Sequence, residues 1–195
     1  MRTFSTILLI CLLSLFFVVT VQAQWVQGSV SFKRLLSNGT NLFALTDKAV
    51  FLSTNNGGTW TALTTGLPDN IVYSLAVFGT NLFVGYQDSG VYLSTNNGAS
   101  WTTANTGLPN HIGVLCFAIS GTNIFAGRVS RGVYLSTNNG ASWTAANTGL
   151  PDYTEVRSFA VIGTNIFAGT TNGGTGVFLS TDNGTSWTRV GLIGE

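Results

Sequence analysis

Apolar and polar positions alternate in short runs along the chain, and turn residues separate the runs at regular intervals. The runs are rich in β-branched and aromatic side chains, and glycine and asparagine stand between them. This pattern is typical of β-strands. Beyond the first residues, no stretch shows a sustained helical period. The chain is therefore predicted to be all-β.

Four eight-residue segments repeat in fixed register, and we call each one a Ser–Trp turn. The first reads Ser53-Thr-Asn-Asn-Gly-Gly-Thr-Trp60, and the four tryptophans are 41, 42 and 44 residues apart. A period of this length indicates a repeat architecture such as a propeller. The shared serine, Asn or Asp, glycine and tryptophan positions are Ser53, Asn55, Gly57, Trp60, Ser94, Asn96, Gly98, Trp101, Ser136, Asn138, Gly140, Trp143, Ser180, Asp182, Gly184 and Trp187.

Each repeat is predicted to contain four short strands, with a Gly-Thr-Asn turn after the first and a Ser–Trp turn after the third. The first strands are predicted at Val30–Ser37, Val72–Phe78, Val114–Ser120 and Val156–Ile162. The second strands are predicted at Leu42–Leu45, Leu82–Gly85, Ile124–Gly127 and Ile166–Gly169. The third strands are predicted at Val50–Ser53, Val91–Ser94, Val133–Ser136 and Val177–Ser180, and each fourth strand begins at a turn tryptophan. The four units cover about residues 30–64, 71–105, 113–147 and 155–190.

The Ser–Trp turn has a mechanical explanation. Asn56 and Gly57, with their counterparts, place two residues that tolerate positive φ at the hairpin tip. The side chain of Asn55 is expected to bind backbone N–H groups of its own turn, and the following hydroxyl to close the loop. We expect each tryptophan to bury its ring against the next unit. Sheets with two apolar faces hide both by stacking around an axis, as in a propeller.

The pattern Ser-x-Asp/Asn-x-Gly-x-Thr/Ser-Trp resembles the Asp-box, or BNR, repeat, and the resemblance covers essentially the whole chain after the first residues. Such repeats occur in sialidases, sortilin-type receptors, some xyloglucanases and proteins similar to photosystem II assembly factors, all of them β-propellers. Three of the four turns have asparagine where the motif name has aspartate. The resemblance implies that this turn is structural and says nothing of chemistry.

Four blades are few for a ring, because relatives with this motif generally have six or more. After Trp187, the segment Val190-Gly-Leu-Ile-Gly-Glu195 replaces the Thr-Gly-Leu-Pro linker of the other units. We therefore expect four four-stranded antiparallel blades in an open or partial ring. The exposed apolar end faces would then favour self-association or continuation into further blades of a longer chain.

The first 23 residues are predicted to be a signal peptide, and residues 24–195 the repeat domain. Ile7–Val19 is almost wholly apolar, and Val21-Gln-Ala23 ends in a small residue, as a signal-peptidase site requires. We expect a secreted, periplasmic or cell-surface protein, of bacterial type, with no membrane attachment after cleavage. Cleavage leaves Cys116 as the one cysteine, in a position aligned with Ser74 and Ser158 that suggests a small buried core residue.

Composition excludes several functions. Lys plus Arg number 8 against 7 for Asp plus Glu, so no strong field attracts nucleic acid or an anionic membrane. The single histidine and the absence of a cysteine pair make a transition-metal site improbable. We expect no metal and no cofactor.

Sequence differences between units concentrate in two sets of loops, which an up-and-down blade places at one end. These are the loops between the second and third strands and the loops that link the units. We expect a glycan or protein ligand to bind there, although charges also collect in any exposed loop. The candidate ligand-binding residues are Tyr86, Asp88, His111, Arg128, Arg131, Tyr153 and Glu155.

A glycoside hydrolase, sialidase-like or xyloglucanase-like, or a fragment of one, is the alternative interpretation. An ordinary glycosidase needs two converging carboxylates. Asp47, Asp69 and Asp88 each lie in a different loop, and Asp182 belongs to a Ser–Trp turn. We therefore expect a binding or scaffold protein with no catalytic residues.

Overall fold

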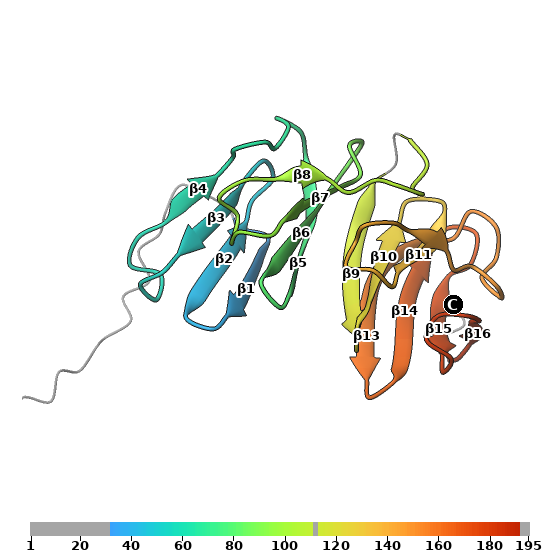
Figure 1. Cartoon of the computed structure of the whole chain (residues 1–195). Coiled ribbons are helices and arrows are strands. Elements are labelled where there is room, and N and C mark those ends of the chain that lie inside the picture. The colour runs from blue at the N-terminus through green and yellow to red at the C-terminus, as the bar shows by residue number, and fades with distance from the viewer. Residues whose placement is uncertain (1–31, 111–112, 192–195) are drawn as a thin grey trace, which may run out of the picture.

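The computed structural model describes residues 32–110 and 113–191, and in these ranges the chain is all-β (Figure 1). Four four-stranded antiparallel sheets follow one another, each with its strands in chain order, and we number them blades 1 to 4. The predicted signal peptide, Val30 and His111 lie outside the described residues. The predicted fold class of four antiparallel four-stranded blades is confirmed.

The strands of the blades have the following bounds. Blade 1 contains β1 (Arg34–Asn38), β2 (Asn41–Leu45), β3 (Val50–Ser53) and β4 (Thr61–Leu63). Blade 2 contains β5 (Val72–Phe78), β6 (Asn81–Tyr86), β7 (Val91–Ser94) and β8 (Thr102–Thr103). Blade 3 contains β9 (Val114–Ser120), β10 (Asn123–Arg128), β11 (Gly132–Ser136) and β12 (Thr144–Ala145). Blade 4 contains β13 (Glu155–Ile162), β14 (Asn165–Thr171), β15 (Gly176–Ser180) and β16 (Thr188–Arg189).

The fourth strands begin one residue later than predicted, after each turn tryptophan and not at it. In blades 2 to 4 the N–H of the tryptophan makes a backbone hydrogen bond outside its own blade. The N–H of Trp101 donates to the carbonyl of Thr65, which belongs to the linker that precedes blade 2, at 3.1 Å. Trp143 and Trp187 make the same bond to the preceding linker. The first strand is also shorter than predicted, since β1 begins at Arg34.

The Ser–Trp turn closes on its own side chains, as predicted. In blade 2 the Ser94 hydroxyl donates to Oδ1 of Asn96 at 2.8 Å and accepts from the N–H of Gly98 at 2.8 Å. The same Oδ1 accepts from the N–H of Ser100, and the amide nitrogen of Asn96 donates to the Ser100 hydroxyl, both at 2.9 Å. Asn97 at the tip has a φ of 55°. These hydrogen bonds all join residues of the turn itself, so they do not depend on the rest of the fold.

Each blade from 2 to 4 packs its tryptophan against the preceding blade, so the expectation that it packs on the next unit is wrong. Trp143 of blade 3 lies in a buried cluster with Ala76, Phe83 and Val91 of blade 2. Its indole N–H donates to the carbonyl of Ala104, also in blade 2, at 2.9 Å. We call the face that carries the tryptophan the leading face of a blade, and the opposite face the trailing face.

The interface between blades 2 and 3 and the interface between blades 3 and 4 repeat the same contacts. The Phe83 ring on the trailing face of blade 2 fills the space beside Gly140 of blade 3, where a Cβ would overlap the ring. Phe125 of blade 3 lies in the same way against Gly184 of blade 4. Both phenylalanines are fully buried. A close fit between a ring and a glycine therefore sets how near blades 3 and 4 approach the blade before them, whereas Leu63 of blade 1 fills the place beside Gly98 of blade 2.

The four blades do not close into a ring, so blade 1 has an uncovered leading face and blade 4 an uncovered trailing face (Figure 1). Trp60 of blade 1 is only half-buried, unlike the other three turn tryptophans. The reason is that none of the described residues belongs to a blade that precedes it.

Candidate functional site

The loops between second and third strands meet the linking loops at one end of the blades, which we call the loop end. The N–H of Gln87 donates to the carbonyl of Ile71 at 2.9 Å, and the N–H of Gly132 to that of Thr154 at 2.8 Å. The side chains of Asn70 and Ser89 also meet across these loops. The loops that vary between units therefore form one continuous end, opposite the Ser–Trp turns.

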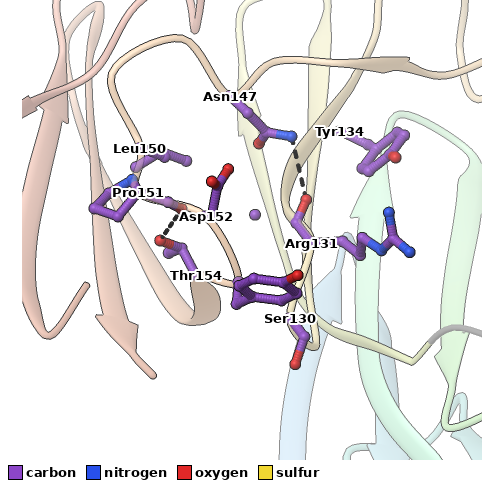
Figure 2. A pocket seen from close by; sticks show the side chains of 10 residues that line it. Ser130, Arg131, Tyr134, Asn147, Leu150, Pro151, Asp152 and Thr154 are labelled. Carbon is purple, nitrogen blue, oxygen red and sulfur yellow. Dashed lines mark hydrogen bonds between the residues drawn. The ribbon is translucent and has the colours of Figure 1, made fainter. Parts of the chain in front are cut away.

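Two cavities open at the loop end, in equivalent places of consecutive repeats. The larger, of about 460 Å³, lies between blades 3 and 4 and is lined by Ser130, Arg131, Gly132, Tyr134, Asn147, Leu150, Pro151, Asp152, Tyr153 and Thr154 (Figure 2). The smaller, of about 170 Å³, is lined by Asp88, Ser89, Gly90, Asn105, Leu108, Pro109 and Asn110. Because seven positions correspond one to one, the frame comes from the repeat, and the two linings differ in the side chains at the variable positions.

An asparagine holds the frame of each cavity. The amide of Asn147 accepts from the N–H of Val133 at 2.7 Å and donates to the carbonyl of Arg131 at 3.2 Å (Figure 2). Asn105 makes the same two bonds, to Val91 and Ser89, in the smaller cavity. The oxygen and the nitrogen of the amide both bond to the backbone of the loop, so this side chain fixes the loop. Contacts to a ligand would come from the neighbouring side chains.

Tyr153 forms the open rim of the larger cavity, where 76% of the residue is exposed. It has a φ of 59°, which is unusual for an aromatic residue. The Thr154 hydroxyl donates to the carbonyl of Pro151 at 2.6 Å and fixes the turn. A Cβ at Gly173 would overlap the carbonyl of Asp152, so the backbone of blade 4 lies directly against this linker. Gly173–Gly176 therefore supports the rim.

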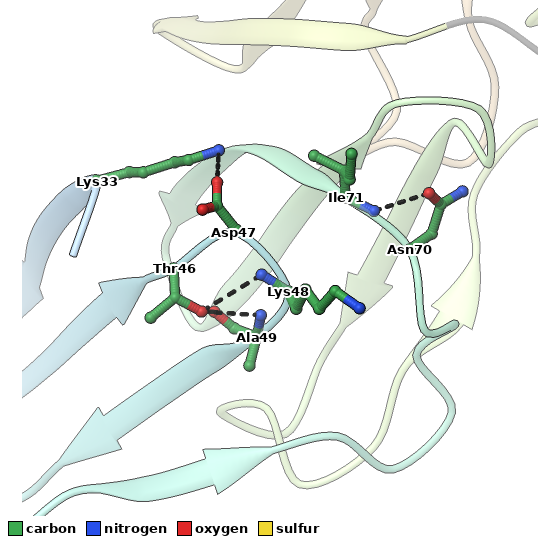
Figure 3. A network of polar contacts seen from close by, with 7 residues as sticks. All are labelled: Lys33, Thr46, Asp47, Lys48, Ala49, Asn70 and Ile71. Atoms are coloured by element: carbon green, nitrogen blue, oxygen red, sulfur yellow. Dashed lines mark hydrogen bonds and ion pairs between the residues drawn. The ribbon is translucent and has the colours of Figure 1, made fainter. Parts of the chain in front are cut away.

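In blade 1 the corresponding loop is short and closes on itself (Figure 3). The Thr46 hydroxyl accepts from the N–H groups of Lys48 at 3.4 Å and Ala49 at 3.0 Å. Asp47 forms an ion pair with Lys33, and Lys48 lies 3.6 Å from Asp69. Its polar groups thus pair with one another at the surface.

Two predicted ligand-binding residues do not reach the surface. Tyr86 and Arg128, at the ends of β6 and β10, occupy equivalent positions on the leading faces and are fully buried. The guanidinium of Arg128 lies 4.6 Å from the ring centroid of Tyr134, which lines the larger cavity. Arg128 has no hydrogen-bond partner among the described residues. Burial lowers the pKa of Arg128 to about 10, and burial raises the pKa of Tyr86 well above its ordinary value.

Glu155 is also buried, because it begins β13 directly behind the linker. Its carboxylate accepts a hydrogen bond of 2.9 Å from the amide of Asn172 and forms an ion pair with Arg157. Asp88 lines the smaller cavity, and Arg131 and Tyr153 line the larger one. The structure therefore brings Arg131 and Tyr153 to one cavity and Asp88 to the other, while Tyr86, Arg128 and Glu155 are buried.

Sequence reasoning missed several residues of the larger cavity, namely Ser130, Tyr134, Asn147 and Asp152. The asparagine had a usable signal, since Asn105 and Asn147 each follow a Ser–Trp turn at the same spacing. Among the described residues, no group of three or more His, Cys, Asp or Glu side chains could hold a metal ion. The described part of the chain also has no helix that is long and apolar enough to span a membrane.

The sequence matches the model of the DUF6242 beta propeller domain over residues 20–154, more than half of its length. The chain belongs to this family. The family supplies a description of fold, which agrees with the four blades described above. No curated protein matches the sequence.

Solved structures similar to this DUF6242 domain include parts of longer chains. The GH74 xyloglucanase from Xanthomonas campestris has a TM-score of 0.64 at 18% identity, over 80% of this chain and 30% of its own. The extracellular domain of BT4673 from B. thetaiotaomicron, described as a one component system, has a TM-score of 0.70 at 13% identity, over 87% and 23%. YCF48 bound to D1 peptide has a TM-score of 0.61 at 15% identity, over 84% and 56%.

The DUF6242 domain therefore spans less than a third of the xyloglucanase and less than a quarter of the BT4673 domain. At these identities the likeness concerns the fold alone. The activity of the first protein and the bound peptide of the third belong to those proteins.

Proposed function

We propose that this chain is an exported, non-catalytic Asp-box repeat protein that binds a glycan at its loop end. The observation that carries the proposal is the cavity between blades 3 and 4, which combines an exposed aromatic ring with polar side chains. The ring of Tyr153 lies open on the rim, and Arg131 and Asp152 line the cavity beside it. Sugars present apolar C–H faces that stack on such rings and hydroxyls that bind such polar groups.

The repeat frame suits this role. Asn147 and the glycines of blade 4 hold the linker in a fixed conformation, so the rim loses little conformational freedom when a ligand binds. The Ser–Trp turns lie at the opposite end, and their polar side chains are occupied within each turn. Their hydrogen bonding supports the assignment to Asp-box repeats, and the apolar Ile7–Val19 segment supports export.

The proposal is tested by screening the purified full chain on a glycan array, followed by calorimetric titration with the strongest hit. Tyr153→Ala and Arg131→Ala are expected to weaken binding by about tenfold each, because each removes a contact worth roughly 1.4 kcal/mol. Thr122→Ala, in an exposed turn at the opposite end, is the matched control and should bind as the parent does.

Two results would count against the proposal. Binding of a protein segment and of no glycan would keep the loop end as a site but assign it another ligand class. Turnover of a chromogenic glycoside, abolished by Asp88→Asn or Asp152→Asn, would instead make the chain a glycosidase. Either result would be visible with the same purified protein.

A further inference from the structure

The two uncovered faces at the ends of the array match each other in residue type. The trailing face of each blade presents the same phenylalanine, valine and leucine positions, Phe43, Phe83, Phe125 and Phe167, then Val50, Val91, Val133 and Val177, then Leu52, Leu93, Leu135 and Leu179. In blades 1 to 3 the phenylalanine and valine are fully buried by the following blade. In blade 4, Phe167 and Val177 are only partly covered.

The leading face of blade 1 shows the reverse situation. Leu35 is 58% exposed, whereas Leu75, at the same position in blade 2, is 1% exposed. Phe32 is exposed as well, and its ring packs on Trp60 with centroids 5.8 Å apart. These side chains form an apolar surface of the kind that blades 2, 3 and 4 bury against the blade before them.

The interfaces between blades within one chain indicate which side chains would meet if the two open faces came together. Phe83 packs on Phe117, and Phe125 on Phe159, with ring centroids 6.4 Å apart in both pairs. The positions that correspond to the second pair on the open faces are Phe167 of blade 4 and Leu35 of blade 1. Gly57 has no phenylalanine beside it, whereas Gly140 and Gly184 each have one, and Gly98 has Leu63 of blade 1 in that place.

We propose that a second copy of this chain docks head to tail, its blade 1 leading face covering the blade 4 trailing face of the first. Phe167 then packs on Leu35 and beside Gly57 of the second copy, as Phe125 packs on Phe159 and Gly184 within one chain. The indole N–H of Trp60 donates to the carbonyl of Val190 in the neighbouring copy, as that of Trp187 donates to Ala146 at 2.8 Å. The new interface continues the interior ones, and it places nothing over the loop end.

The occupant follows from this continuity. The trailing face of a blade offers a phenylalanine ring and, beside it, a backbone carbonyl. A partner must bring a glycine against that ring and a tryptophan N–H to that carbonyl. The leading face of a blade of this repeat carries both the glycine and the tryptophan. A second copy of the chain supplies such a face in its blade 1. The two exposed faces are of opposite kind, so one pairs with the other and neither pairs with itself.

Sedimentation velocity and native mass spectrometry of the purified full chain test the proposal. The chain is expected to self-associate, with an average mass that falls on dilution. Leu35→Lys and Phe167→Glu should each weaken association by about tenfold or more, because each places a charge in an apolar contact. Ile71→Lys is the matched control, since Ile71 is an exposed apolar residue of a linking loop.

Mixing the two variants separates head-to-tail docking from other modes. An equimolar mixture of Leu35→Lys and Phe167→Glu chains should associate more tightly than either variant alone, because it contains one unaltered contact and one Lys–Glu contact. Thermal melts of the dilute variants should match the parent, since neither side chain is fully buried in a single chain.

A cross-linking experiment tests the same contact without introducing a charge that weakens it. A chain with Leu35→Cys mixed with a chain with Phe167→Cys should be linked by a short bismaleimide, and each variant alone should not. A parent chain that stays monomeric at every concentration, a mixture no tighter than its components, or the absence of the mixed cross-link would overturn the proposal.

Discussion

The indole N–H of Trp143 in blade 3 donates a 2.9 Å hydrogen bond to the carbonyl of Ala104 in blade 2. The residue that directly follows the outer strand of one blade is thereby bonded to the turn tryptophan of the next, and Trp187 and Ala146 repeat the arrangement at 2.8 Å. Trp143 and Trp187 therefore link consecutive blades, whereas the buried indole N–H of Trp101 has no hydrogen-bond partner among the described residues. The first prediction concerns Trp143.

Trp143→Ala should lower the free energy of unfolding by about 3–5 kcal/mol, because the ring is buried between two blades and its removal leaves a cavity. Trp143→Phe keeps most of the ring volume and should cost about 1–2 kcal/mol, through the carbonyl of Ala104 that loses its donor. Urea unfolding of the two variants measures the difference. Equal midpoints for both variants and the parent would contradict this account of the interface.

The second prediction concerns the Ser–Trp turn. Asn96→Ala should cost about 1–2 kcal/mol, since the N–H of Ser100 and the hydroxyl of Ser94 lose their acceptor. Asn96→Asp should be tolerated, because Asp182 makes the corresponding bonds to Ser180 and Ser186 in blade 4. Thermal melts near neutral pH compare the two, and an alanine variant as stable as the aspartate variant would be inconsistent with the hydrogen-bond scheme.

The third prediction is a pH dependence carried by Asp182. Hydrogen bonds from the Ser186 side chain and backbone, and from Ser180, lower the pKa of this carboxylate to about 2. A carboxylate with a lowered pKa in the folded state stabilises above its unfolded value of about 3.9, and this contribution is lost as the pH falls through about 2.

Asp182→Asn should therefore flatten the pH dependence of stability between about pH 4 and pH 2. Asn138→Asp, in the corresponding turn of blade 3, is the reciprocal variant and should steepen it. Unfolding midpoints measured from pH 7 to pH 2 check both. Parallel curves for the parent and both variants would show that the turn carboxylate does not contribute.

The fourth prediction concerns Cys116, whose sequence alignment with Ser74 led us to expect a small buried residue, as found. Its thiol donates to the carbonyl of Val156 in blade 4 at 3.4 Å, as the Ser74 hydroxyl donates to Val114 in blade 3 at 2.8 Å. Burial raises the pKa of the thiol to about 12. Cys116 should therefore resist thiol reagents at pH 8 in the folded protein and react in denaturant.

Cys116→Ser should keep the bond and the stability, whereas Cys116→Ala should cost about 1 kcal/mol. Rapid labelling of the folded parent would refute the burial argument.

The fifth prediction concerns Arg128. A buried guanidinium without a hydrogen-bond partner among the described residues opposes folding, and its cation–π contact with Tyr134 offsets this only in part. Arg128→Met should raise the free energy of unfolding by about 1–4 kcal/mol. Arg131→Met, a change of the same kind at an exposed site, should stay within about 0.5 kcal/mol of the parent. A destabilised Arg128→Met variant would show that the guanidinium has a structural partner.

The sequence by itself determined the repeat, the sixteen strands and the geometry of each Ser–Trp turn. The turn could be predicted because all of its partners lie within a few residues, as when Asn55 receives the N–H of Thr59 at 2.8 Å. Strand periodicity and turn chemistry are local properties, and they appear directly in the order of residues. The buried place of Cys116 was also visible, since the repeat aligns it with Ser74.

Tertiary structure alone decided which neighbour each side chain meets. Trp101 was expected to pack on the following blade and packs on the preceding one. Tyr86, Arg128 and Glu155 were expected in an exposed surface and are buried, since the ends of the strands sit beneath the adjacent blade or linker. The cavity at Arg131 and Tyr153 exists only because two loops about twenty residues apart converge. Such contacts depend on how twisted sheets stack, and the twist that sets their stacking has no signature in any short segment of the chain.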